Sequence, residues 1–155
     1  MTELRFACDA MLGRLAGWLR LAGFDASFDA SLAGPALAGR AREEGRWLLT
    51  CDRRLASLAG PRVVLLHGAG VEAQIRELRR RLSLTAAPER FLARCSVCNG
   101  DLAPAAREAV AGLVPPYVAV HAARFLRCAG CGRVYWPGSH AAAINRRLQA
   151  LFGGL

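Results

Sequence analysis

Short apolar runs alternate with segments of helical periodicity through the first half of the chain. Four runs are compatible with buried strands, at 3–8, 24–28, 46–50 and 62–67. Apolar residues recur at helical spacing in the segments between and after them, so we expect helices over 9–23, 35–45, 53–60 and 71–84. Strands that alternate with helices predict a parallel sheet with helices on its faces. The predicted fold class is therefore α/β.

The pattern changes after Leu84. The segment 85–90 reads as a linker, and beyond it lie two Cys-x-x-Cys pairs with Gly- and Pro-containing turns between them. A last helical segment covers 140–152. We therefore predict an α/β domain over 1–84 and a small module with a C-terminal helix over 91–155.

Two of the predicted strands stop on the same dipeptide. Asp9 follows Cys8, and Asp52 follows Cys51. Side chains alternate along a strand, so each cysteine should point into the core while the aspartate projects from the strand end. Open parallel sheets form binding sites beyond the carboxyl ends of their strands, where we also expect Thr50. Carboxylates that converge there can bind Mg²⁺ or Mn²⁺. The alternative is that each aspartate caps the helix that follows it.

Other charged residues near these strand ends are further candidates. Asp29 precedes a helix and is the candidate third ligand, whereas Asp25 reads as a turn residue with a structural role. Arg14 and Arg53 lie just after the two aspartates in the sequence, where they could contact the phosphates of a substrate. The alternative for both arginines is a solvated helix face.

Four of the six cysteines form the two closely spaced pairs. Cys95 and Cys98 make the first pair, and Cys128 and Cys131 make the second. Two such turns can supply four thiolates to one tetrahedral zinc ion, and four protein ligands leave no open position, so we expect a structural zinc site. The 29 residues 99–127 between the pairs suit a β-hairpin insert. The alternatives are a redox pair or two unrelated cysteine pairs.

Composition and charge indicate what kind of protein carries these sites and what it could bind. Of the 155 residues, 54 % are hydrophobic, which is enough for a packed core. No apolar run approaches the roughly 18–20 residues of a membrane span, and we read no export signal, so we expect a cytoplasmic protein without disulfides. The formal net charge is +9, and all 21 basic residues are arginine. A basic surface of this kind attracts polyanions such as RNA or DNA.

Aromatic residues follow the second cysteine pair. Tyr135 and Trp136 lie in the stretch “VYWPGSH”, with His140 at its end. Their rings could stack on unpaired bases. They could equally pack the small module against the α/β domain.

Several stretches together resemble one known family. They are “FACDAMLGRLAGWLRLAGFD”, “EEGRWLLTCDRRL”, the paired “CSVC” and “CAGC”, and “CGRVYWPGSH”. In this order they resemble the Mut-seven C-terminal RNase domain family from about residue 5 to residue 150. The resemblance implies a PIN-like nuclease domain joined to a zinc ribbon, and cleavage of RNA with a divalent metal. It also implies that Asp9 and Asp52 belong to the acidic site, and that the chain could form a homodimer, since PIN-like domains often pair.

Two classes of function stay open. In the first, the chain is a ribonuclease in which Asp9, Asp52 and Asp29 hold Mg²⁺ or Mn²⁺ and the basic surface holds the RNA. In the second, a degenerate acidic site leaves a non-catalytic module that binds RNA or docks a protein partner through its zinc ribbon. The absence of any carboxylate between Asp29 and Glu43 keeps the second class open.

Overall fold

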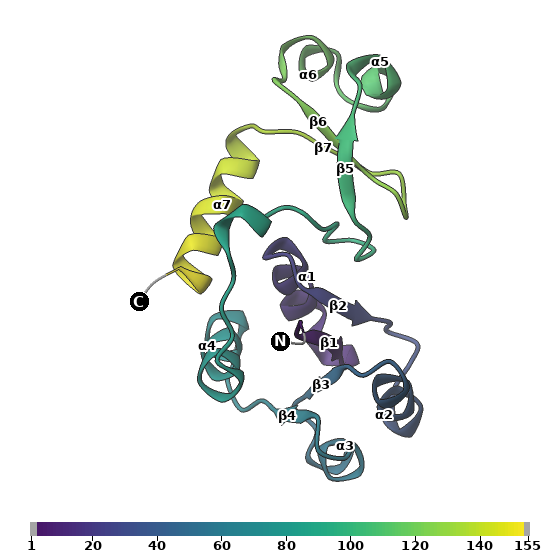
Figure 1. The fold of residues 1–155 in the computed structure, drawn as a ribbon, viewed down its shortest axis with the longest axis vertical. Helices are drawn as coiled ribbons and strands as arrows, with labels where there is room; N and C mark the ends of the chain where they lie inside the picture. Colours follow the sequence, from purple (N-terminus) through teal and green to yellow (C-terminus); the bar gives the residue numbers. More distant parts are fainter. Residues whose placement is uncertain (1–2, 154–155) are drawn as a thin grey trace.

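The structure, a computed structural model, describes residues 3–153 and contains two sheets (Figure 1). The first is parallel, in the order β2-β1-β3-β4, and comprises β1 (Arg5–Cys8), β2 (Asp25–Phe28), β3 (Trp47–Thr50) and β4 (Val63–Leu65). The second is antiparallel, in the order β5-β6-β7, and comprises β5 (Leu102–Ala105), β6 (Phe125–Cys128) and β7 (Val134–Tyr135). The predicted α/β class, with a parallel sheet and a smaller second module, is confirmed.

Helices connect the strands of the first sheet close to the predicted positions. They are the 3-10 turn η1 (Ala10–Leu12), α1 (Gly13–Leu21), α2 (Gly34–Glu43), α3 (Arg53–Leu58) and α4 (Val71–Leu82). Helix α1 ends before Gly23, whose φ of 98° is left-handed and favours glycine. A Cβ at Gly23 would also lie 2.7 Å from the backbone oxygen of Arg90. Within residues 3–153, no helix combines the length and the apolar character that a membrane crossing requires.

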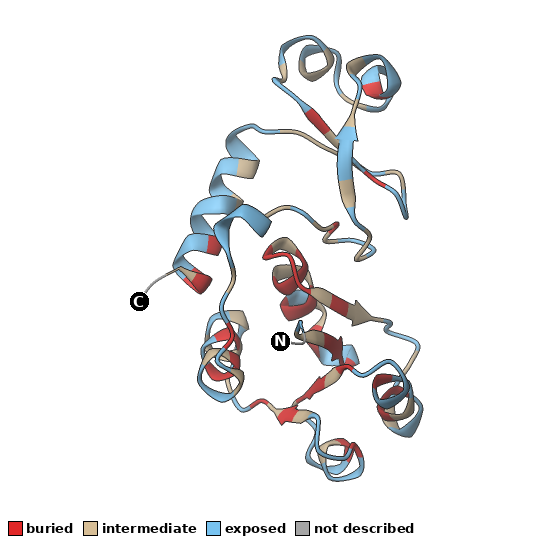
Figure 2. Ribbon diagram, in the orientation of Figure 1, coloured by how far each residue is buried: buried red, intermediate tan, exposed pale blue. Residues whose placement is uncertain are grey.

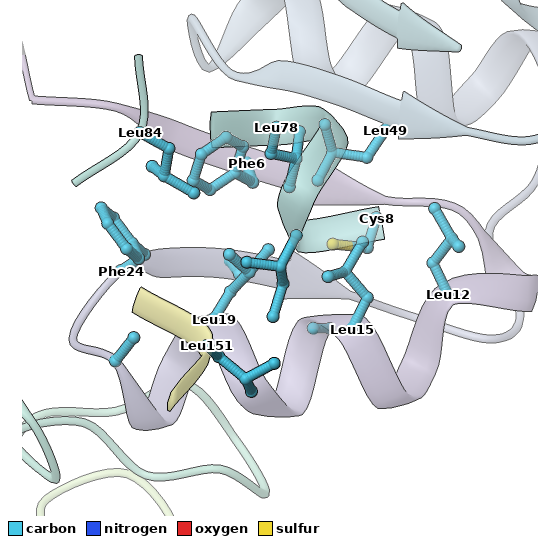
Figure 3. Packing of buried hydrophobic residues seen from close by; sticks show 14 of the residues in the cluster. Phe6, Cys8, Leu12, Leu15, Leu19, Phe24, Leu49, Leu78, Leu84 and Leu151 are labelled. Atoms are coloured by element: carbon cyan, nitrogen blue, oxygen red, sulfur yellow. The ribbon is translucent and has the colours of Figure 1, made fainter. Parts of the chain in front are cut away.

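The helices divide between the two faces of the parallel sheet because side chains alternate along each strand. Phe6 and Cys8 of β1 pack with Leu15 of α1 and Leu78 of α4 (Figure 3). Ala7 points to the other face and packs with buried residues of α2 and α3. Buried residues therefore gather on both faces, as is usual for parallel sheets (Figure 2). The predicted core position of Cys8 is confirmed.

The C-terminal helix α7 (Ser139–Phe152) packs against the core of the first sheet. Leu148, Leu151 and Phe152 are buried in the same cluster as Phe6. Figure 3 shows Leu151 of this helix beside the core. The ring of Phe152 lies 6.1 Å from that of Phe24, measured between ring centroids. The division of the chain into two units stays a prediction, and the buried residues of this helix belong to the core of the parallel sheet.

The segment between the two cysteine pairs differs from the expected β-hairpin. β5 and β6 do pair as antiparallel strands. Between them lie α5 (Arg107–Val110), the 3-10 turn η3 (Ala111–Leu113) and α6 (Pro116–His121). The expectation of a simple hairpin is therefore wrong. In the sequence, Pro115 and Pro116 indicate a turn, but proline is also tolerated in the first turn of a helix, and Pro116 begins α6. Much of this insert is exposed (Figure 2).

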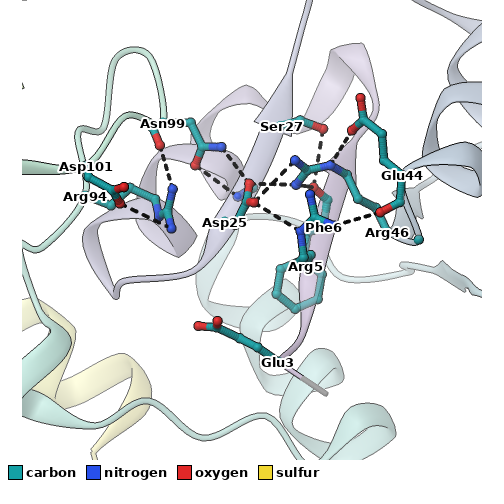
Figure 4. A network of polar contacts seen from close by, with 12 residues as sticks. Glu3, Arg5, Phe6, Asp25, Ser27, Glu44, Arg46, Arg94, Asn99 and Asp101 are labelled. Atoms are coloured by element: carbon teal, nitrogen blue, oxygen red, sulfur yellow. Dashed lines mark hydrogen bonds and ion pairs between the residues drawn. The ribbon is translucent and has the colours of Figure 1, made fainter. Parts of the chain in front are cut away.

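A short linker with the 3-10 turn η2 (Pro88–Arg90) joins the two sheets, and the turn after it docks on α1 and β2. Arg20 of α1 is buried and donates to the carbonyl oxygen of Ser96 at 3.0 Å. Asn99 donates its side-chain N–H to Asp25 of β2 at 2.7 Å (Figure 4). The first cysteine turn is thereby fixed to the edge of the parallel sheet.

Candidate active site and metal centre

The candidate active site lies at the carboxyl ends of the two central strands. β1 and β3 are neighbours, with Cys8 opposite Leu49, and the chain leaves them in opposite directions, toward β2 and toward β4. Open α/β sheets form binding sites where the strand order reverses in this way. Asp9 comes directly after β1, and Asp52 comes two residues after Thr50, which ends β3. The structure thus places these three side chains together at the carboxyl ends of the central strands, as the sequence predicts.

Thr50 connects the two aspartates. Its hydroxyl donates to Oδ2 of Asp9 at 2.8 Å and accepts the backbone N–H of Asp52 at 3.0 Å. Thr50 is fully buried, and Asp9 is only 8 % exposed. A hydrogen bond to a carboxyl group in such buried surroundings fixes the orientation of that group. The predicted contact of Thr50 with substrate stays a prediction.

Each aspartate also caps the helical turn that follows it, which confirms the capping alternative. Oδ1 of Asp9 accepts the backbone N–H of Ala10 at 2.8 Å. Oδ1 of Asp52 accepts the backbone N–H groups of Arg54 at 2.8 Å and Leu55 at 3.4 Å. Capping does not use the full acceptor capacity of these carboxylates, because each oxygen has two lone pairs. Oδ2 of Asp52 accepts no hydrogen bond from any of the residues 3–153.

No arginine neutralises Asp9 or Asp52 within the part of the chain that the structure describes. Asp25, the first residue of β2 at the opposite end of the sheet, is different (Figure 4). It accepts hydrogen bonds from Arg46 at 2.6 Å and from Arg5 at 3.2 Å. Burial opposes the ionisation of Asp25, but these arginines and Asn99 outweigh that effect and lower its pKa to about 2. The expected turn position of Asp25 is wrong, because the residue begins a strand. Its structural role is confirmed, because its carboxylate pairs with Arg46 and Arg5.

Asp29 follows β2 at the same edge as Asp9, but its side chain is exposed. It accepts the hydroxyl of Ser31 at 2.6 Å and the backbone N–H of Ser31 at 2.9 Å, and these hydrogen bonds lower the pKa of Asp29. Three aspartate oxygens within 4.8 Å of one another are not found among residues 3–153. The role of Asp29 as a third metal ligand stays a prediction.

Arg14 and Arg53 lie at the start of the two helices that follow the aspartates. Arg14 is the second residue of α1, and Arg53 is the first residue of α3. Both side chains are exposed at this edge of the sheet. Their predicted contacts with the phosphates of a substrate stay predictions, since an exposed position also suits a solvated helix face.

A further buried carboxylate at this edge was not predicted. Glu77 of α4 is 7 % exposed and accepts the backbone N–H groups of His67 and Gly68, just beyond β4. Burial raises the pKa of Cys51, and the nearby charges of Asp9 and Glu77 raise it further. Both carboxylates therefore act on the same thiol. In the sequence, Glu77 lies in an arginine-rich helix and cannot be told from a solvated glutamate.

The four predicted cysteines form a compact cluster in the second module. The Sγ atoms of Cys95, Cys98, Cys128 and Cys131 all lie within 4.8 Å of one another. The Sγ–Sγ distance is 3.3 Å between Cys98 and Cys128, and 3.8 Å between Cys95 and Cys131. Thiolates bound to one tetrahedral zinc ion lie about 3.8 Å apart, since the Zn–S distance is about 2.3 Å. The cluster therefore fits a metal such as zinc.

Hydrogen-bond partners outweigh burial and lower the pKa of Cys95 and Cys128, whereas the hydrogen bond with Cys128 raises the pKa of Cys98 to about 12. The hydroxyl of Tyr135 lies 3.0 Å from the Sγ of Cys95, and the backbone N–H of Gly130 donates to the Sγ of Cys128 at 3.3 Å. A Cβ at Gly100 would lie 2.8 Å from the Sγ of Cys128, so the chain can pass there only as glycine. Burial opposes the ionisation of Cys95, but hydrogen bonds from Tyr135 and from the backbone lower its pKa to about 6. Thiolates are the form that binds metal.

Comparison with known proteins agrees with this arrangement. A family model described as Mut7-C RNAse domain matches residues 4–148, nearly the whole chain. No match was found among curated proteins or among solved structures.

Proposed function

The chain belongs to the Mut7-C RNAse domain family, and on this premise we propose that it is a metal-dependent ribonuclease whose divalent cation is held by Asp9 and Asp52. The family supports a nuclease-like role connected with RNA. The metal, the chemistry and the residues are inferences from this chain's own geometry.

The observation that carries the proposal is the environment of Asp9. This carboxylate is nearly buried, accepts the hydroxyl of Thr50, and has no ion-pair partner among residues 3–153. Buried charges are normally paired or coordinate metals, because an uncompensated charge is costly to remove from water. Asp25 meets that requirement through Arg46 and Arg5. Asp9 would meet it through a cation shared with Asp52.

Two carboxylates suit Mg²⁺ or Mn²⁺ in this setting. Mg²⁺ usually keeps several waters and is bound by one or two carboxylates together with substrate phosphates, so a third protein ligand is not required. A divalent cation bound there would lower the pKa of water and stabilise negative charge on a phosphodiester. Asp29, at the end of the neighbouring strand, is the residue from which we expect additional ligation.

The residues of the chain have separate tasks in this proposal. Thr50 orients Asp9 by donating to its Oδ2, and the N-terminus of α3 orients Asp52 by donating to its Oδ1. Arg14 and Arg53, exposed at the same edge, would contact the phosphates of the RNA. The net charge of +9 would attract the RNA over a longer range.

We assign the cysteine cluster a structural role. Four thiolate ligands would complete a tetrahedral zinc site and leave no position for a substrate. Zinc would hold the first cysteine turn in shape, and this turn contacts β2 through Asn99. The metal would therefore stabilise the second module and its contact with the parallel sheet.

The test is cleavage of single-stranded RNA by the zinc-loaded chain with Mn²⁺ or Mg²⁺. We expect cleavage by the wild type, loss of cleavage in Asp9→Asn, and unchanged cleavage in the matched control Asp101→Asn, whose side chain is 83 % exposed. Equal cleavage by wild type and Asp9→Asn would point to a contaminating nuclease and remove the support for this site.

A second candidate function is a non-catalytic module that binds RNA. It is favoured by one observation: within residues 3–153, the group of three or more possible metal ligands is the cysteine cluster, not the aspartates. In that case the same experiment gives RNA binding without cleavage, by the wild type and by Asp9→Asn alike.

A further inference from the structure

A groove of about 750 Å³ lies in the second module, between α6, β7 and the start of α7. Phe91 and Leu92 of the linker contribute to its lining, as does Leu21 at the end of α1. Besides Phe91, the ring-bearing and charged side chains in its lining are Tyr117, His121, Arg124, Arg133, Tyr135, Trp136 and His140. None of Asp9, Thr50 and Asp52 lines this groove, whereas Tyr135, whose hydroxyl contacts Cys95 of the cysteine cluster, does.

Two of these rings are already stacked. The rings of Tyr117 and His121 are 4.0 Å apart between centroids, with 19° between their planes. Tyr117 is nevertheless 73 % exposed, so it is not a core residue. A stacked pair with an open ring face is suited to extend the stack by one unpaired base, since every base has a π-face.

The helix that carries this pair is held at its C-terminal end. Arg107 donates to the carbonyl oxygens of Ala119 and Ala122, and its guanidinium lies 5.2 Å from the ring centroid of Phe125. These contacts fix the end of α6 against β6. The stacked rings are therefore presented on a supported helix and not on a free loop.

The charge of the groove is uniformly basic. Arg124 and Arg133 are exposed, and neither forms an ion pair with any residue of the described range 3–153. No aspartate or glutamate is found among the described residues that line the groove. Unpaired cations beside open aromatic faces match a strand that carries phosphates and unstacked bases. An apolar partner would leave these arginines uncompensated.

We propose that this groove binds unpaired RNA, with a base stacked on Tyr117 and the phosphate backbone contacted by Arg124 and Arg133. The inference rests on the proposed function, because it assigns the site that holds the substrate. Leu21 lines the groove at one end of α1, whereas Asp9 precedes the other end. The η1 turn and α1 lie between them, and twelve residues at about 1.5 Å each separate the two by roughly 18 Å, so one strand of several nucleotides could contact both.

Binding is measured by fluorescence anisotropy with a labelled single-stranded RNA of about twelve nucleotides. All proteins are full-length and zinc-loaded, and carry Asp9→Asn so that the probe stays intact. Tyr117→Ala should weaken binding roughly 5- to 150-fold, the equivalent of about 1–3 kcal/mol for one stacked base. Tyr117→Phe should restore the affinity. Val120→Ala, on the same helix and 68 % exposed, is the matched control and should change nothing.

A second pair of variants tests the phosphate contact. Arg124→Gln should reduce the slope of log affinity against log salt by about 0.7, the contribution of one phosphate contact in a single strand. Arg80→Gln removes another exposed arginine, on α4 and outside the groove, and should leave the slope unchanged.

The possible outcomes separate this inference from the proposed function. Affinity within two-fold of the parent in both Tyr117→Ala and Arg124→Gln, as expected if the groove takes a protein segment, overturns the inference. An equal loss in Val120→Ala also overturns it. Tight, Tyr117-dependent binding by a wild-type chain that cleaves nothing supports the inference and defeats the proposed function. Cleavage and affinity that are both unaffected by Tyr117→Ala support the proposed function and overturn the inference.

Discussion

The hydroxyl of Thr50 donates to Asp9 at 2.8 Å across the two central strands, and the same oxygen accepts the backbone N–H of Asp52 at 3.0 Å. The sheet order makes this contact possible, because β1 and β3 are neighbours whose chains diverge at their carboxyl ends. One buried threonine thus relates the side chain of one aspartate to the backbone of the other. In the proposed active site, this arrangement would hold the two aspartates in position.

Thr50→Val tests that frame. The change keeps the shape of the side chain but removes the donor to a nearly buried carboxylate, so we expect a loss of about 1–3 kcal/mol in the free energy of unfolding. Cleavage and Mn²⁺ affinity should fall with it. Thr50→Ser keeps the hydroxyl and should restore both functional readouts, although it loses about 0.8 kcal/mol for one buried methyl group. Equal function in Val and Ser variants would show that Thr50 only packs.

Asp25→Asn tests the polar link between the modules. The pKa of Asp25 is lowered from 3.8 to about 2, so its contribution to stability is present above pH 4 and is lost as the pH falls through 2. We expect the variant to be less stable than the wild type by on the order of 1–2 kcal/mol at pH 6. The difference between the two proteins should shrink as the pH approaches 2 and vanish below it. Urea unfolding at several pH values measures it, and a constant difference would contradict the assignment.

Metal removal tests the cysteine cluster. The purified chain should contain one zinc ion, and a strong chelator should expose the amides of β5 and β6 to hydrogen exchange, because a module of this size depends on its metal. Metal analysis should find little zinc in Cys98→Ser. The matched control is Cys51→Ser, which changes a cysteine outside the cluster and should keep the zinc. Full zinc content in Cys98→Ser would rule out the four-thiolate site.

Leu148→Ala tests the docking of α7 on the parallel sheet. Leu148 is fully buried in the core that contains Phe6, so we expect a loss of about 2–5 kcal/mol in the free energy of unfolding. Trp18 and Trp47 report on this part of the chain by fluorescence in a Trp136→Phe background. Leu113→Ala, at a 56 % exposed position, is the control and should cost less than about 0.5 kcal/mol. Little effect of Leu148→Ala would mean that α7 belongs to the second module alone.

Local sequence patterns were sufficient to predict much of the fold and the positions of the two central aspartates. Alternation and helical periodicity placed the elements of the first sheet, and a strand followed by a helix placed Asp9 and Asp52 at one edge. The spacing of the cysteines predicted their cluster, since each pair is a local turn. These features depend on residues that are close together in the sequence.

Features that depend on distant partners were not predictable. Asn99 meets Asp25 across 74 positions of the sequence, and nothing near either residue indicates the other. Glu77 reaches the backbone beyond β4 from an arginine-rich helix in which every glutamate looks solvated. The periodicity of α7 predicts a buried face, but not that Leu148 would be buried in the first core. The sequence pattern defines which face is apolar, and only the tertiary fold determines what covers it.

The central claim is that Asp9 and Asp52 hold one divalent cation, and Mn²⁺ binding by the zinc-loaded chain tests it most directly. Electron paramagnetic resonance of free Mn²⁺ counts the bound ions in wild type, Asp9→Asn, Asp52→Asn and the control Asp101→Asn. We predict one bound Mn²⁺ in wild type and in the control, and at least a tenfold weaker affinity, about 1.4 kcal/mol, in each of the other two. No binding by the wild type, or equal binding by all four proteins, would contradict the account.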